Sequence, residues 1–351
     1  MIPEFYESWH IAPKLIILLV FMVVGVVFLV KFCDLFVDAA SSIAKKLKIA
    51  PMIIGLTVVA MGTSLPELAV SVSDSIACLT EGGNANVALG NVVGSNIANI
   101  VLVLGLSIVF TPIIVKKSSL KKEFPFLLGV SLLLFIFVLS IGLGTGNYMV
   151  TRWMGIIFVV LIIGYITFLV LDAKKHPVED ENAEEIKDMK MWKAILFVII
   201  GAAGIAAGGE FVVFGAKGLS VTTATAMGLD HDLAESLVGL TIVAVGTSLP
   251  ELVTSVVAAK KGENDIALGN VIGSNIFNIL FVLGISATVN PLTTGSQIVV
   301  DLSVMMGITI LLFGFALTKK LDRKMGFIFL AIYVLYITYL ILRTVGVIPQ
   351  F

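Results

Sequence analysis

The sequence predicts an all-α polytopic membrane protein with ten transmembrane helices in two inverted five-helix repeats. Three observations carry this prediction: the composition, a series of long apolar runs, and two phrases that each occur twice. Of the 351 residues, 58% are hydrophobic and only 13% are charged, and the mean hydropathy is +1.07. A soluble domain of this size needs far more charge on its surface. We therefore expect a protein of the lipid bilayer.

The apolar runs divide into ten segments. Runs such as residues 15–30 and 126–144 suit helices of about 20 residues that cross a bilayer. The polar stretch 173–190 separates a first repeat, residues 1–172, from a second, residues 191–351. We place the ten helices near residues 13–44, 51–80, 84–111, 121–142, 149–172, 191–220, 233–260, 263–289, 296–318 and 322–346.

Basic residues set the orientation of these segments. Lys and Arg cluster in the connections that follow the first, third, fifth, seventh and ninth segments, and few occur in the others. Connections rich in Lys and Arg face the cytoplasm by the positive-inside rule. We therefore expect an integral protein of the cell membrane, with both termini outside and residues 173–190 as a cytoplasmic linker.

Two phrases recur, one in each half. "AMGTSLPELAVS" (60–71) returns as "AVGTSLPELVTS" (244–255), and "ALGNVVGSNIANI" (88–100) returns as "ALGNVIGSNIFNI" (267–279) with 11 of 13 positions identical. A weaker similarity joins 34–40 to 210–216 and makes Asp34 and Glu210 candidates for lining an access route. Because each repeat has an odd number of helices, the second must enter the membrane from the opposite side. That geometry brings Glu67 and Glu251 together.

These two glutamates require an explanation because each lies inside a long apolar run. A carboxylate in the bilayer costs several kcal/mol unless it is paired, hydrated, protonated or bound to a cation. No Lys or Arg of the second, third, seventh or eighth predicted helix lies near either one. Two facing glutamates repel each other unless a cation lies between them. A hard cation with oxygen ligands meets this need.

The rest of each phrase offers further oxygens. Gly62 with Pro66, like Gly246 with Pro250, predicts an interrupted or kinked helix at the glutamate, which would free backbone carbonyls. Glycine pairs in the second phrase (Gly90 and Gly94, Gly269 and Gly273) predict close approach of neighbouring helices. The candidate backbone carbonyls are those of Ala60 and Ala244, and the candidate hydroxyls are those of Thr63, Ser64, Thr247 and Ser248. Each second phrase adds a serine and an asparagine four residues apart on one helical face, Ser95 with Asn99 and Ser274 with Asn278.

At these residues a family resemblance becomes specific. "GTSLPEL" followed by "GNVVGSNIANI", both present twice, resembles the alpha repeats of the cation/calcium antiporter superfamily, and the sequence is most similar to its prokaryotic sodium/calcium exchangers. The resemblance covers both halves. It implies that Glu67 and Glu251 are the main calcium ligands, helped by Thr63 and Thr247. It also implies sodium and central sites from the same glutamates and from Ala60, Ser64, Ser95, Asn99, Ala244, Ser248, Ser274 and Asn278.

Two departures refine that resemblance. The "GNAVEH"-like phrase of proton/calcium relatives is absent from the sequence, which disfavours that branch. Asn278 stands where some relatives, including potassium-coupled ones, have Asp, which disfavours potassium coupling. The site would thus carry one negative charge fewer than in those relatives.

The expected function is secondary antiport of sodium against calcium by alternating access, with the first and sixth predicted helices sliding as a gating bundle. Proton-coupled or other divalent-cation antiport and a passive calcium channel remain alternatives. No serine or acid has a paired histidine, so we expect no enzyme. Calcium and sodium would be transported ions rather than cofactors. The lipid bilayer is the other expected partner, no nucleic acid is expected, and the oligomeric state stays open.

Overall fold

A computed structural model describes residues 11–81, 87–176, 189–226, 244–344 and 347. Eight of its helices are long and apolar enough to cross a membrane, and a bent pair, Pro51–Thr63 with Leu65–Thr80, makes a ninth span. Of the seventh predicted helix, residues 233–260, residues 233–243 lie outside the described residues, and the remainder is helical with one break. The all-α membrane fold is therefore confirmed, and the count of ten remains a prediction.

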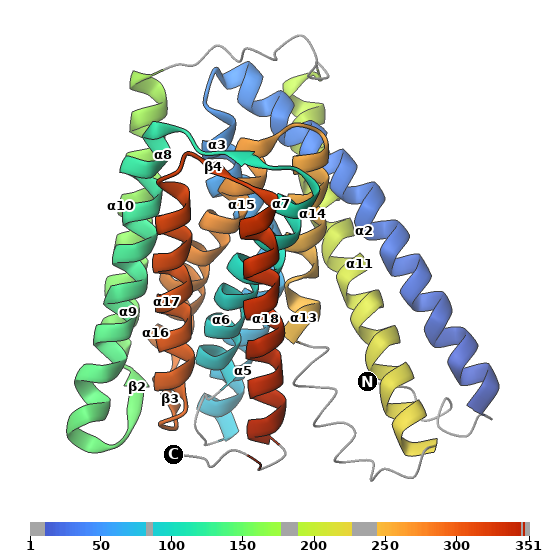
Figure 1. Cartoon of the computed structure of the whole chain (residues 1–351), viewed down its shortest axis with the longest axis vertical. Coiled ribbons are helices and arrows are strands. Elements are labelled where there is room, and N and C mark those ends of the chain that lie inside the picture. The colour runs from blue at the N-terminus through green and yellow to red at the C-terminus, as the bar shows by residue number, and fades with distance from the viewer. Residues whose placement is uncertain (1–10, 82–86, 177–188, 227–243, 345–346, 348–351) are drawn as a thin grey trace.

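The first half consists of one long helix, a broken span and three further spans (Figure 1). Its elements are α2 (Ile11–Leu47), α3 (Pro51–Ile54), the π-helical segment η1 (Gly55–Val59), α4 (Ala60–Thr63), α5 (Leu65–Glu81), α6 (Val87–Ala98), the π-helical segment η2 (Asn99–Leu104), α7 (Gly105–Phe110), β1 (Ile113–Ile114), α8 (Lys117–Lys121), α9 (Glu123–Thr145), β2 (Tyr148–Val150) and α10 (Arg152–Lys175).

The second half follows the same order. Its elements are α11 (Met191–Ala226), α13 (Ala244–Thr247), α14 (Leu249–Lys260), α15 (Asn264–Phe277), the π-helical segment η4 (Asn278–Val282), α16 (Leu283–Val289), β3 (Leu292–Thr294), α17 (Ile298–Ala316), β4 (Lys320–Leu321) and α18 (Arg323–Thr344).

Burial separates central spans from peripheral ones. In the most apolar stretch of Asn264–Val289, 94% of the residues are buried, and the value for Val87–Phe110 is 78%. The same measure is 17% for both Pro13–Leu47 and Arg323–Arg343. Since the exposed faces of the peripheral helices are apolar, as at Val160, Ile163 and Leu335, they suit contact with lipid. The two copies of the second repeated phrase therefore lie on the two most buried of these spans.

Helices α2 and α11 form a long antiparallel pair that stands beside the other helices (Figure 1). Their backbones approach closely because α11 presents glycines to α2 at spacings of three to seven residues. A Cβ atom on any of these glycines would lie within 2.9 Å of an α2 atom, as small-residue helix interfaces in membranes require. The glycines are Gly201, Gly204, Gly208, Gly215 and Gly218.

Two short antiparallel ribbons mark the inverted relation of the halves. In one, Ile113 of β1 pairs with Leu321 of β4, and in the other Val150 of β2 pairs with Leu292 of β3. The ribbons lie at opposite ends of the molecule (Figure 1). The offset of the second repeated phrase, 267 − 88 = 179 positions, carries Ile113 onto Leu292. Equivalent strands thus sit at opposite ends, as an inverted repeat requires.

The predicted close packing of glycine pairs is met in the second half. A Cβ on Gly269 would lie 2.7 Å from the Met52 carbonyl oxygen, and one on Gly273 would lie 2.8 Å from the Leu56 Cα. Gly90 and Gly94 have no heavy atom within 4 Å of such a Cβ among the described residues. Residues 52–60 pack against Gly269 and Gly273, and the repeat carries these residues onto 236–244. Most of that range lies outside the described part of the chain.

Replacing Gly273 with alanine is expected to lower the melting temperature of the detergent-solubilised protein, because the added methyl group must displace the Leu56 backbone. Overpacking of this kind costs about 1–3 kcal/mol. The control is Gly164→Ala in α10, where nothing lies within 4 Å of the added atom. Equal melting temperatures for the two variants would contradict the packing argument.

Candidate functional site

Each glutamate-bearing span breaks three residues before its glutamate. Ser64 separates α4 from α5 with a bend of 49° across the break, and Ser248 separates α13 from α14. Pro66 and Pro250 each occupy the second position of the helix that follows. Because proline has no N–H, the carbonyl four residues earlier receives no helical hydrogen bond from it. The predicted interruption is confirmed in both halves.

At the first break the Ala60 carbonyl, which the sequence predicts to be freed, is hydrogen-bonded. The Ala60 carbonyl accepts hydrogen bonds from the Ser64 N–H at 3.0 Å and from the Thr63 hydroxyl at 3.3 Å. The expectation of an unpaired carbonyl at Ala60 is therefore wrong in this structure. Proline instead withholds its bond from Gly62 and, in the second half, from Gly246. Ala244 begins α13, and nothing further is described for it.

The two glutamates meet in the interior. Glu67 and Glu251 are each 0% exposed, and they are close enough to interact electrostatically. The Ser64 hydroxyl donates a hydrogen bond across the halves to Glu251 Oε1 at 3.1 Å. Both oxygens of Glu67 and the second oxygen of Glu251 have no hydrogen-bond partner among the described residues. Three buried carboxylate oxygens are thus left to bind a proton or a cation.

Three further predicted ligand residues are placed at this pair, directly or through one hydrogen bond. Ser95 lies beside the Glu67 carboxyl group and Thr63 beside that of Glu251, and Thr63 and Ser274 share a hydrogen bond of 3.4 Å. An unpartnered buried polar atom costs about 1–3 kcal/mol unless a ligand satisfies it. Within the described residues, such atoms on the remaining predicted ligands are the Asn99 amide, the Thr247 and Ser248 hydroxyls and the Asn278 Oδ1.

Both halves place an asparagine at the first residue of a π-helical segment. Asn99 begins η2 and Asn278 begins η4, and both side chains are fully buried. A π-helical turn contains one extra residue and occurs frequently at functional sites. The sequence pattern identified these asparagines but gave no sign of the π-helical turns.

Three asparagines at the site were missed by the sequence reasoning. Asn270 Nδ2 donates to the Glu251 carbonyl at 3.4 Å and to the Ser255 hydroxyl at 2.9 Å, and its Oδ1 accepts from Thr63 at 3.1 Å. Asn96 and Asn275, which are repeat-equivalent, contact each other through the Asn275 carbonyl. All three are invariant between the two copies of the second phrase, and that identity was the signal that could have found them.

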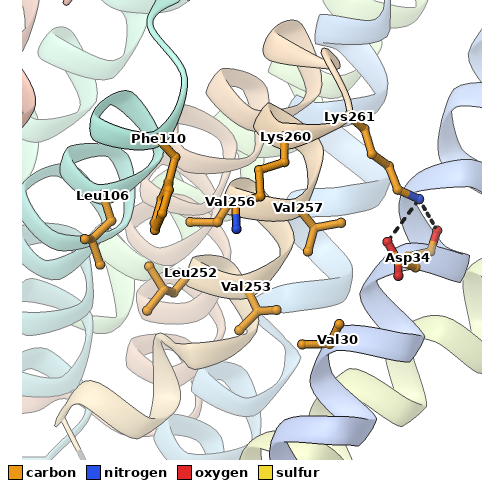
Figure 2. Close-up of a pocket in the computed structure, with 10 residues that line it drawn as sticks. All are labelled: Val30, Asp34, Leu106, Phe110, Leu252, Val253, Val256, Val257, Lys260 and Lys261. Atoms are coloured by element: carbon orange, nitrogen blue, oxygen red, sulfur yellow. Dashed lines mark hydrogen bonds and ion pairs between the residues drawn. The ribbon is translucent and has the colours of Figure 1, made fainter. Parts of the chain in front are cut away.

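A cleft of about 460 Å³ lies beside the helix that carries Glu251. It runs between α2, α7 and α14, and its walls are mainly valine, leucine and Phe110 (Figure 2). Leu252, which lies in its wall, directly follows Glu251. Asp34 lines this cleft, Glu210 does not belong to its lining, and the part of either residue in an access route stays a prediction.

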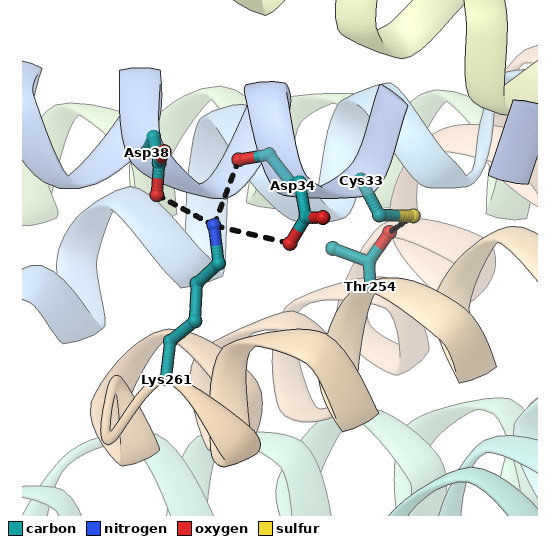
Figure 3. A network of polar contacts seen from close by, with 5 residues as sticks. All are labelled: Cys33, Asp34, Asp38, Thr254 and Lys261. Carbon is teal, nitrogen blue, oxygen red and sulfur yellow. Dashed lines mark hydrogen bonds and ion pairs between the residues drawn. The ribbon is translucent and has the colours of Figure 1, made fainter. Parts of the chain in front are cut away.

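Lys261 ties α2 to the end of α14 beside this cleft (Figure 3). Its Nζ lies 2.6 Å from Asp38 Oδ1 and 3.2 Å from Asp34 Oδ1, and it donates to the Asp34 carbonyl at 3.1 Å. Deeper in the same interface, the Cys33 thiol and the Thr254 hydroxyl share a hydrogen bond of 3.3 Å. Polar contacts therefore hold the long helix pair against the helix that carries Glu251.

The chemistry of the donor set is that of a hard-cation site. In the part of the chain that the structure describes, no three His, Cys, Asp or Glu residues gather into a metal cluster. Two carboxylates accompanied by hydroxyl, amide and backbone oxygens remain. Such a set suits sodium or calcium and gives no nitrogen or sulfur ligand for zinc or copper.

The comparison with known families agrees with this donor set. A family model described as "Sodium/calcium exchanger protein" matches residues 17–171 and 193–342, which is most of the chain. The chain belongs to the sodium/calcium exchanger protein family. Members of this family are transporters, so the family places the chain among membrane exchangers and not among enzymes.

Relatives of this exchanger-family chain match over nearly their whole length. A "Putative antiporter CaxA" of Alkalimonas amylolytica is 38% identical over 90% of this chain and 96% of its own. The "Sodium/calcium exchanger MaX1" of Methanosarcina acetivorans is 32% identical over 91% and 97%. A solved sodium/calcium exchanger from Methanococcus jannaschii superposes with a TM-score of 0.76 at 30% identity, covering 92% of this chain and 98% of that one.

Removing the Asn270 side chain should destabilise this exchanger-family protein more than removing its repeat counterpart. Asn270→Ala removes three hydrogen bonds, those with Thr63, Ser255 and the Glu251 carbonyl, whereas Asn91 makes one side-chain hydrogen bond within the described residues, to Ser71 at 3.2 Å. Each lost buried partner costs about 1–3 kcal/mol. We expect a clearly lower melting temperature for Asn270→Ala than for Asn91→Ala, measured by thermal unfolding in detergent. The reverse order would show that the network does not support the site.

Proposed function

We propose that the protein is a secondary antiporter that exchanges sodium for calcium across the membrane by alternating access. The observation that carries the proposal is the pair of fully buried carboxylates, Glu67 and Glu251, each placed at the break of a repeated span without a basic partner. The names of the full-length relatives support the same ions. The proposed ligands are Ala60, Thr63, Ser64, Glu67, Ser95, Asn99, Ala244, Thr247, Ser248, Glu251, Ser274 and Asn278.

Competition for shared oxygens would couple the two ions. A calcium ion between Glu67 and Glu251 neutralises both carboxylates at once. Sodium ions need the same carboxylates together with the surrounding hydroxyl and amide oxygens, so calcium and sodium exclude each other. The two carboxylates must be neutralised before the site can change the side of the membrane to which it opens. The site therefore changes sides only with a cation bound, which is the requirement for exchange.

The proposed movement is a sliding of α2 and α11 along the remaining helices. The pair is packed backbone to backbone, which suits movement as one unit. At the two helix breaks the pair faces glycines: Phe36 and Ala202 lie against Gly62, and Val213 lies against Gly246. Sliding in one direction would open the cleft beside α14. Sliding in the other direction would open an equivalent cleft at the opposite end of the molecule.

The proposed setting is the cell membrane with both termini outside. Helix α2 begins and α18 ends at one end of the molecule, and α8 and β4, whose neighbouring connections are rich in lysine, lie at the other (Figure 1). Segregation of the basic connections to one end supports a cytoplasmic location for that end.

Calcium-45 uptake into sodium-loaded proteoliposomes tests the exchange directly. Wild-type uptake is expected to require internal sodium, because only exchange links the two gradients. Glu67→Gln and Glu251→Gln should each reduce the rate by at least tenfold, since each removes one charge from a buried divalent-cation site. Asp74→Asn is the matched control: it removes a carboxylate from the same helix as Glu67, two turns further along, and should retain uptake.

The alternatives predict different outcomes of this assay. Uptake that is indifferent to sodium but driven by a pH gradient would assign proton coupling instead. Calcium uptake that follows the calcium gradient alone, and that neither a sodium gradient nor a pH gradient changes, would identify a passive channel and overturn the proposal.

A disulfide between α2 and α14 tests the sliding movement. Thr254→Cys places a second thiol beside native Cys33, whose sulfur lies 3.3 Å from the Thr254 oxygen (Figure 3). Oxidation should stop exchange by fixing α2 to α14, and reduction should restore it. Uptake by the same proteoliposomes before and after oxidant is the measurement.

The matched control is Cys33→Ser combined with Thr254→Cys, which carries a thiol at 254 but cannot close the bridge. Oxidant should leave its uptake unchanged. If mass spectrometry shows the bridge formed in Thr254→Cys and exchange continues, α2 does not move relative to α14 during transport.

A further inference from the structure

We propose that Asn96 is a positioning residue that turns the Asn278 amide so that its oxygen, and not its NH₂ group, is offered to the transported cation. This inference rests on the proposed function, because it assigns a role at the same cation site. It concerns a residue outside the proposed ligand set. It is carried by a chain of three hydrogen-bonding groups whose direction is fixed by chemistry.

The chain begins at a group that can only accept. Asn96 Nδ2 lies 3.3 Å from the backbone carbonyl oxygen of Asn275. A carbonyl oxygen has no proton to give, so the Asn96 atom facing it must be the NH₂ nitrogen. The Asn96 oxygen is therefore directed to the other side of its amide plane.

The second bond transmits that direction to Asn278. Asn96 Oδ1 lies 3.2 Å from Asn278 Nδ2. Because Asn96 presents an acceptor there, Asn278 must present its donor, and its own oxygen is left for another partner. Asn278 Oδ1 is buried and has no hydrogen-bond partner among the described residues. A neutral amide oxygen left in this way is a hard ligand of the kind that calcium and sodium accept.

Burial makes this orientation matter. Asn96 is 1% exposed and Asn278 is 0% exposed, so bulk water does not compensate for a reversed amide. A reversed Asn278 would set its NH₂ group against the cation and its oxygen against Asn96 Oδ1. Both contacts are repulsive, and low-dielectric surroundings strengthen them. Asn96 itself uses one atom of its amide for the Asn275 carbonyl and the other for Asn278.

The equivalent contacts are missing in the other half. Repeat symmetry maps Asn96 onto Asn275 and Asn99 onto Asn278, both with the offset of 179 (275 − 96 and 278 − 99). No hydrogen-bond partner occurs, within the residues described, for the amide atoms of Asn275 or of Asn99. One central amide is therefore oriented by the protein, and the other takes its orientation from what it binds.

A double-mutant cycle in calcium transport separates this role from a merely structural one. Asn96→Leu removes both hydrogen bonds at similar volume and should raise the KM for calcium about tenfold with a smaller change in Vmax. In an Asn278→Asp background, where an oxygen is presented in either orientation, Asn96→Leu should change KM by less than twofold. An equal effect of Asn96→Leu in the two backgrounds would overturn the proposal.

Two further variants sharpen the cycle. Asn96→Asp keeps an oxygen that accepts the hydrogen bond from Asn278 Nδ2, so its KM for calcium should lie within about threefold of the wild-type value. Asn275→Leu, the repeat-equivalent change, keeps the backbone carbonyl acceptor and should leave KM within about twofold. A tenfold rise in KM for either variant would contradict the oriented chain. If Asn96→Leu is not monodisperse in detergent, Asn96→Ala replaces it in the same cycle.

The wild-type arm keeps this test distinct from that of the proposed function. Absence of sodium-dependent calcium uptake in wild-type proteoliposomes would defeat the proposed exchange before any variant is compared. Normal wild-type exchange with an uncoupled cycle would defeat only the role of Asn96.

Discussion

The structure depends on one constraint, which is the burial of two carboxylates that have no basic partner. Glu67 and Glu251 are fully buried, and three of their four oxygens have no hydrogen-bond partner in the described part of the protein. Their charge therefore calls for a proton or a cation. The glutamate-bearing spans break at Ser64 and Ser248, and of the neighbouring hydroxyls those of Ser64 and Thr63 lie beside Glu251 and that of Ser95 lies beside Glu67. Irregular backbone at this depth is tolerated only where it lines such a site.

An inverted repeat supplies the site twice, but the two copies are not used alike. Ser64 donates to Glu251, whereas the equivalent Ser248 hydroxyl has no partner among the described residues. Thr63 is bonded to Asn270 and Ser274, whereas the Thr247 hydroxyl is unpartnered within the same limits. One half of the site is thus organised by protein contacts, and the other half leaves its oxygens available. Near-identical sequence thus has two different local environments in this structure.

Much of this arrangement could be predicted from the sequence, because repeated phrases and apolar runs report burial and topology directly. The spans, the breaks at Pro66 and Pro250 and the meeting of Glu67 with Glu251 all follow from those patterns. The position of the unpaired carbonyl did not follow, since it depends on which residue completes the last helical turn. The roles of Asn96 and Asn270 were also beyond reach. An asparagine in an apolar phrase gives no sign of which neighbour its amide contacts, because that contact is set by how the helices cross.

Lys261 breaks the symmetry of the repeat in another way. The positions equivalent to Lys261 and Asp38 are Ala77 and Phe214, so the ion pairs that join α2 to α14 have no copy at the opposite end. A partly exposed pair of this kind stabilises the arrangement that contains it by at most about 1 kcal/mol. In the proposed exchange cycle, that energy would skew the populations of two otherwise matched conformations by at most about fivefold. An inverted repeat would make the two faces of the membrane equivalent, and an ion pair without a repeat copy would favour one of them.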